Sequence, residues 1–168
     1  MRCAYLAVLP FLLATPALAQ DTSLPLIAKL MGGLVDGGEM LQGSLGKGQV
    51  KAIGEGAFEV TFAKGAATFV YDQPDTCVFT QHSQMANEPG TAADARFDFT
   101  KVTGIEIRDQ GEFEGLHAVL ITFAGAEDML QVMLGDKLVN QVPAFAFLAT
   151  SMPVEDFQAA ADELQRIC

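Results

Sequence analysis

The two histidines are the side chains best suited to proton transfer or ligation, because an imidazole changes protonation state near neutral pH. His117 is in phase with the large apolar residues of the segment 117–123. This pattern predicts that His117 faces the core and has a structural role. His82 shares one face of a predicted strand with Thr80 and is followed by a polar segment. His82 is therefore the candidate functional residue.

The spacing of the other reactive residues matches no catalytic or metal-binding pattern. A hydrolytic triad needs a positioned nucleophile beside its histidine, and the chain has no G-x-S-x-G sequence. A zinc or copper site would need His82 and His117 to meet a carboxylate such as Asp72 or Asp75, with no H-x-H or H-E-x-x-H spacing to favour it. Calcium-loop and phosphate-loop patterns are also missing from the sequence. We expect no cofactor, and a hydrolase or metal site at His82 is the third and last functional alternative.

The cysteines predict one disulfide. Cys3 falls in the leader segment described below, which leaves Cys77 and Cys168, 91 positions apart. An even pair of cysteines in an exported chain is typical of a structural bridge, whereas two catalytic or metal-binding thiols would favour a C-x-x-C spacing. Closing a loop of this length corresponds to about 4–5 kcal/mol in the chain-entropy description.

Residues 1–19 have the organisation of a secretory signal peptide. Arg2 supplies the positive start, residues 4–13 are almost entirely apolar, and the sequence Ala-Leu-Ala ends at Ala19. Cleavage is expected between Ala19 and Gln20, with export to the periplasm or the extracellular medium. The alternative, a membrane anchor, is disfavoured because prolines interrupt a run shorter than the ~20 residues that a spanning helix needs.

The charge of the chain is strongly negative, at −11. Loss of Arg2 with the leader leaves 9 basic and 21 acidic residues, a formal charge of −12. Such a surface argues against nucleic acid and anionic membranes as partners. The simplest role of the charge is solubility, and the alternative is a docking face for a basic protein, which needs a clustered acidic patch. After residue 19 no apolar run is long enough to span a membrane. The acidic residues that could form a docking patch, if their strands are neighbours, are Glu106, Asp109, Glu112, Glu114, Glu127 and Asp128.

Hydrophobic periodicity predicts a helix at each end of residues 20–168, which we expect to form a single domain. The first helix runs from Leu24 to about Met31 and weakens at the glycines that follow. The last begins at Pro153, has Glu155 in its first turn, and carries one apolar face. That face consists of Val154, Phe157, Ala161 and Leu164.

Between these helices the period changes to two, which predicts about seven or eight antiparallel strands in a meander. Residues 72–75 are expected to form a turn, Ser83–Ala95 a structureless loop, and Gly104 a bulge.

The twelve phenylalanines alternate with polar residues in several strands, which indicates a dry core. The predicted fold class is α+β, with both helices packed on the sheet. The predicted strands are 58–62, 66–71, 77–82, 96–102, 105–107, 117–123, 129–134 and 138–142, and 144–148 is expected to be a buried continuation.

These observations favour an exported, non-enzymatic module that binds a protein partner or serves the cell envelope. Its expected contact surfaces are the acidic face and the segment Ser83–Ala95. The alternative is a carrier of a small apolar ligand or lipid, with a curved sheet and the first helix as a lid. In that case the mouth of the cavity would be lined by Leu26, Ile27, Leu30, Met31 and Leu34.

Overall fold

The computed structural model describes residues 23–42, 45–86, 92–109, 116–125, 130–134, 137–142, 145–150 and 152–168. The predicted leader, residues 1–19, and its cleavage point between Ala19 and Gln20 lie outside these described residues.

The described residues form two helices, eleven strands and one short 3₁₀ helix, which confirms the predicted α+β class. The helices are α1 (Ser23–Gly32) and α2 (Val154–Ile167), and the 3₁₀ helix is η2 (Phe99–Lys101). The strands are β1 (Glu39–Gln42), β2 (Gly46–Gly54), β3 (Ala57–Phe62), β4 (Gly65–Asp75), β5 (Val78–Met85), β6 (Ala93–Asp98), β7 (Val102–Asp109), β8 (Leu116–Phe123), β9 (Leu130–Leu134), β10 (Lys137–Val142) and β11 (Phe145–Thr150).

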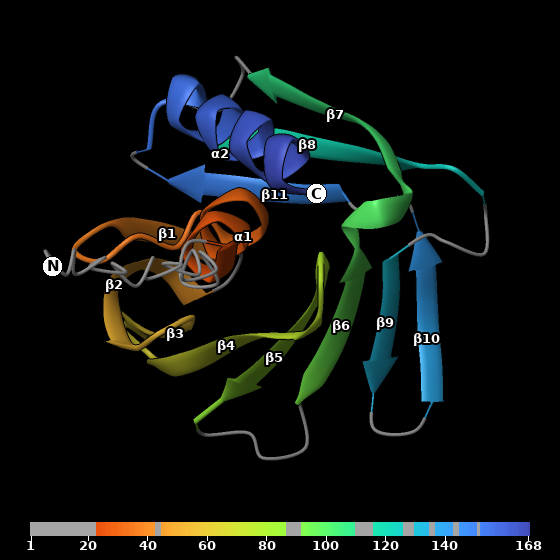
Figure 1. Cartoon of the computed structure of the whole chain (residues 1–168). Coiled ribbons are helices and arrows are strands. Elements are labelled where there is room, and N and C mark those ends of the chain that lie inside the picture. Colours follow the sequence, from red (N-terminus) through yellow and green to blue (C-terminus); the bar gives the residue numbers. More distant parts are fainter. Residues whose placement is uncertain are drawn as a thin grey trace, which may run out of the picture.

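All eleven strands belong to one antiparallel sheet, in the order β10-β9-β6-β5-β4-β3-β2-β1-β11-β8-β7. Strands β1 to β6 follow one another in a meander, as predicted for β3 to β6, but the later strands join it at both edges. The β9–β10 hairpin extends the sheet beside β6, whereas β11, β8 and β7 extend it beside β1. The sheet exceeds the expected seven or eight strands because β1, β2 and β11 were not counted. Figure 1 shows that it curls around α1.

The core lies between the inner face of this curled sheet and helix α1. Ile27 and Leu30 in α1, and Leu34 just beyond its end, are at most 1 % exposed. Alternate residues of the strands meet them, as the period of two requires. The predicted burial of Phe58, Phe62, Phe97 and Phe99 is confirmed; the side chains at positions 145 and 147 lie outside the description. Other buried inner-face residues are Val60, Phe69, Tyr71, Phe79, Val119 and Ile121.

Helix α2 packs against α1 and strand β7 through the predicted apolar face. Phe157, Ala161 and Leu164 are fully buried, whereas Val154 is half-buried at the start of the helix. Glu155 and Asp156 in the first turn and Arg166 in the last complement the helix dipole. Neither helix is long and apolar enough to cross a membrane.

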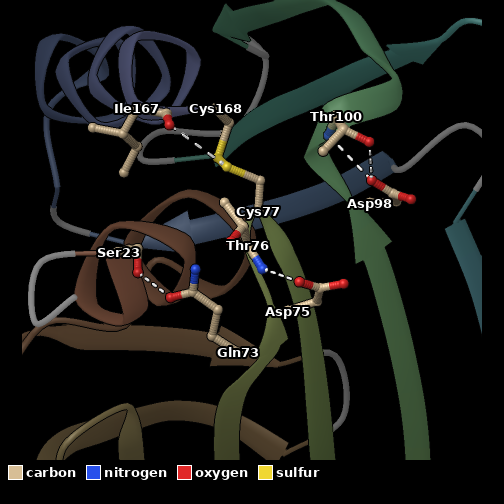
Figure 2. The surroundings of a disulfide bond; sticks show 9 residues. All are labelled: Ser23, Gln73, Asp75, Thr76, Cys77, Asp98, Thr100, Ile167 and Cys168. Atoms are coloured by element: carbon tan, nitrogen blue, oxygen red, sulfur yellow. Dashed lines mark hydrogen bonds between the residues drawn. A yellow bond between two sulfur atoms is a disulfide. The ribbon is translucent and has the colours of Figure 1, made fainter. Parts of the chain in front are cut away.

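The predicted disulfide joins Cys77 to Cys168, with a Cα–Cα distance of 5.5 Å. Figure 2 shows it connecting the end of α2 to the turn between β4 and β5. Cys77 has a left-handed backbone, with φ of 58°, and its carbonyl oxygen accepts a hydrogen bond from the backbone N–H of Phe99 at 2.8 Å. One residue therefore links the last helix, the β4–β5 turn and η2.

Two predicted boundaries are wrong for local reasons. Residues 72–75, expected to form a turn, complete β4, with a register irregularity between Asp72 and Asp75 that accommodates the proline. The turn instead falls at Thr76–Cys77. The predicted strand 96–102 is interrupted by η2, where the side chain of Asp98 accepts a hydrogen bond from the N–H of Thr100. The bulge at Gly104 is confirmed by a register shift between Val102 and Gly104.

Replacing Cys168 by serine should lower the free energy of unfolding by about 2–4 kcal/mol, because the unfolded chain regains the entropy of a long open loop. Thermal unfolding followed by circular dichroism measures this change. A reducing agent should lower the melting temperature of the wild-type protein and leave that of the variant unchanged. Equal melting temperatures for the two oxidised proteins would contradict a structural role for the bridge.

Candidate functional site

The outer face of the sheet, opposite α1, brings polar side chains of strands β4, β5, β6 and β9 together. Cross-strand register places them in two rows. The first row runs Val70, His82, Asp94 and Met133, and the second runs Asp72, Thr80, Arg96 and Gln131. Residues directly opposite each other share one side of a sheet, so each row forms one line of neighbouring side chains.

His82 and Asp94 form the closest contact within these rows. The Nδ1 atom of His82 lies 2.6 Å from Oδ1 of Asp94, and both side chains are about half exposed, at 48 % and 52 %. An ionised carboxylate only accepts hydrogen bonds, so Nδ1 must carry the proton. In the neutral ring, Nε2 is then a hydrogen-bond acceptor. Thr80 lies on the same face as predicted, but its hydroxyl makes no hydrogen bond to His82 among the described residues.

A hollow of about 430 Å³ covers this region. Arg96 is exposed within it and makes no salt bridge or hydrogen bond to any residue that the structure describes. The hollow thus combines an available guanidinium, a hydroxyl and an oriented imidazole with two apolar side chains. It is lined by Val70, Asp72, Thr80, Gln81, His82, Asp94, Ala95, Arg96 and Met133.

His117 lies on the opposite side of the sheet, as predicted for a core histidine. It is 7 % exposed, its Nε2 lies 3.2 Å from the carbonyl oxygen of Met152, and its ring packs edge-on against Phe157 at 5.5 Å. These contacts join β8 to the start of α2. The two histidines therefore occupy different faces and do not share a ligand site.

The described residues contain no group of three or more histidine, cysteine or carboxylate side chains able to hold a metal ion. Asp72 lines the same hollow as His82, whereas Asp75 lies further along β4, opposite Val78, and His117 is on the other face of the sheet. The carboxylate of Asp72 accepts the N–H of Gln73 at 2.8 Å, and that of Asp75 accepts the N–H of Thr76 at 2.7 Å. Both carboxylates therefore bind the backbone N–H of the residue that follows them.

The segment Ser83–Ala95 differs from the structureless loop that was predicted. Residues 83–85 continue β5 and residues 93–95 begin β6, with Ser83 opposite Ala93. Small and polar side chains there fit a strand whose outer face is solvated. Residues 87–91, the middle of the predicted loop, lie outside the described residues.

The predicted acidic patch is represented by one described side chain. Glu106 is exposed on β7 and binds Arg108 through two hydrogen bonds of 2.7 and 2.8 Å. These bonds, together with the charge of Arg108, lower the pKa of Glu106. The side chain of Asp109, and the residues Glu112, Glu114, Glu127 and Asp128, lie outside the description.

The reasoning from sequence missed Asp94 and Arg96. Both fall in or beside the segment taken for a loop, so no cross-strand neighbour was assigned to them. Pairing the strands on either side of that segment as a hairpin would have placed Asp94 opposite His82. Their alternation with the buried Phe97 was the available signal.

Comparison with known proteins yields no matching family model, curated protein or solved structure.

Truncation of His82 and of His117 should change the stability of the protein by different amounts. Replacing His82 by alanine should change the free energy of unfolding by no more than about 0.5 kcal/mol, because its hydrogen bond to Asp94 is half exposed to solvent. Replacing His117 by alanine should lower it by about 2–3 kcal/mol, because a buried hydrogen bond and a ring contact are lost. Urea unfolding of both variants tests this. A large loss for His82→Ala would mean that the outer pair supports the fold.

Proposed function

We propose that this protein is an exported, non-enzymatic binding module that docks a basic protein partner on the outer face of strands β4, β5, β6 and β9. The observation that carries the proposal is the hollow around His82 and Arg96, on the face that the core does not use. Concave sites with apolar walls and a few convergent polar groups are the usual form of binding sites.

The composition of this face supports a binding role. Val70 is 37 % exposed, and Met133 lies across the sheet from it at the other end of the same row. The guanidinium of Arg96, in the neighbouring row, lines the same hollow and has no described partner. Apolar side chains and arginine are enriched where proteins contact one another. A partner that covers the hollow would remove these apolar groups from water and bind the charge.

The net charge supports a basic partner. With a formal charge of −11 for the chain, the protein attracts cationic proteins over distances set by the salt concentration. Long-range attraction and the contacts within the hollow have separate roles. The first raises the rate of encounter, and the second determines which surface is contacted.

Export remains part of this proposal. The first nineteen residues have the pattern of a leader, and a disulfide between Cys77 and Cys168 suits an oxidising compartment. A soluble binding module in the periplasm or the extracellular medium would have both features.

A carrier of a small apolar ligand is the second candidate, favoured by the curled sheet and by Tyr71. The hydroxyl of Tyr71 is buried without a described hydrogen-bond partner, and burial raises the pKa of Tyr71. A Cβ atom added at Gly32 would lie 2.8 Å from this hydroxyl, so α1 passes directly over it. Ile27 and Leu30, expected at the mouth of a cavity, are fully buried between α1 and its neighbours. A ligand would have to displace them.

Native mass spectrometry of protein purified from its host's envelope fraction tests export and the carrier function together. We expect a polypeptide that begins at Gln20 and is two hydrogens lighter than its reduced form. A mass that includes residues 1–19 would contradict cleavage of the leader. An additional bound mass that disappears in organic solvent would favour the carrier.

A capture experiment with two matched valine variants tests the docking face. Val70 on the outer face and Val35 after α1 are almost equally exposed, at 37 % and 38 %. The wild-type protein and Val35→Lys should retain a basic protein from an envelope extract at low salt, and Val70→Lys should lose it. Salt at 1 M, where the Debye length is about 3 Å, should release the partner. Equal capture by both variants would place the contact elsewhere.

A further inference from the structure

We infer that the hollow on the outer face binds the C-terminal carboxylate of a polypeptide whose last residue is apolar, with Arg96 as the anchor. This inference rests on the proposed function, because it names the part of the partner that the docking face would recognise.

Arg96 and Arg108 have the same local sequence setting but different partners. Each follows an acidic residue by two positions on a strand, and such residues share one side of the sheet. Arg108 binds the preceding acid, Glu106, through both Nε and an Nη atom. Arg96 makes no such contact with Asp94, because Asp94 binds His82 across the strands at 2.6 Å. His82 thereby keeps the guanidinium of Arg96 available.

Two further carboxylates lie close to Arg96 among the described residues, and both accept other hydrogen bonds. Asp98, two residues further on, accepts hydrogen bonds from the N–H and the hydroxyl of Thr100 at 3.1 and 2.6 Å. Asp72, beyond Thr80 in the same row, accepts the backbone N–H of Gln73. A guanidinium presents its donors in a planar fork that fits a carboxylate. A ligand carboxylate is therefore the group that best completes this site.

The remaining groups of the hollow match the rest of a C-terminal residue. Nε2 of His82, an acceptor when Nδ1 donates to Asp94, can take the backbone N–H of that residue. Val70 and Met133 flank His82 and Asp94 in the first row and can contact an apolar side chain. The hydroxyl of Thr80, directly opposite Arg96, can donate to the carboxylate. A fatty acid would satisfy the arginine but not the histidine, which favours a polypeptide end.

A pair of peptides tests this inference directly. Acetyl-Ala-Ala-Leu with a free carboxylate should bind the purified protein roughly tenfold more tightly than the same peptide with a C-terminal amide, because the amide loses charge-assisted bonds to Arg96. Titration followed by NMR shifts of outer-face residues gives both affinities. Equal affinities, or no binding of the free acid, would overturn the inference. Octanoate binding as tightly as the free acid would overturn the assignment to a polypeptide.

Four variants identify the residues responsible through the ratio of acid to amide affinity. Arg96→Ala should reduce the ratio to about one, whereas the control Arg108→Ala should leave it unchanged. His82→Ala should also reduce it, because Asp94 is released to bind Arg96. In the double variant His82→Ala/Asp94→Ala the ratio should recover, although both affinities stay lower. A ratio that does not recover would overturn the positioning role of His82.

The two proposals fail in different ways. If Val70→Lys loses the basic partner but Arg96→Ala retains it with unchanged affinity, the docking face stands and the carboxylate inference is wrong. If the acid and amide peptides bind with the expected ratio of affinities but both valine variants capture the same proteins, the carboxylate inference stands and the proposed function is wrong.

Discussion

The structure depends on one requirement, which is that the curled sheet must cover its apolar inner face. An antiparallel sheet that bends this strongly leaves a concave apolar surface, and exposing that surface to water is unfavourable roughly in proportion to its apolar area. Helix α1 meets the requirement from within the same chain. Ile27 and Leu30 are removed completely from solvent there, and Gly32 allows the helix to pass close to Tyr71. Helix α1 therefore covers the inner face of the sheet.

Helix α2 and the disulfide complete this arrangement by fixing α1 in place. The two helices pack on one another, so α1 is held between α2 and the sheet. The C-terminal residue is tied to Cys77, whose carbonyl oxygen also receives the N–H of Phe99. A covalent link at the end of the chain is effective because helix termini otherwise fray first. This packing leaves the side chains of the outer face of strands β4, β5, β6 and β9 unused.

The spacing of apolar residues predicted the helices and strands that bury only one of their faces. Helix α2, strand β3 and the inward position of His117 follow from apolar spacing alone, and the disulfide follows from the two cysteines that lie outside the predicted leader. The outer site could not be predicted in the same way. Its residues come from four strands, and the register that aligns His82 with Asp94 depends on a hairpin whose arms were polar enough to resemble a loop. Strand β1 was missed because four residues are too few to show a period.

The contrast between Arg96 and Arg108 shows why local sequence does not determine the chemistry of a strand residue. Both arginines follow an acidic residue by two positions, in Asp-Ala-Arg and Glu-Ile-Arg. Strand β7 is the edge of the sheet, so no neighbour on its outer side competes for Glu106, and the pair closes on itself. Strand β6 lies between β5 and β9, and the histidine on β5 takes the acid. The position of a strand within the sheet therefore decides whether its arginine is neutralised locally or remains available to another molecule.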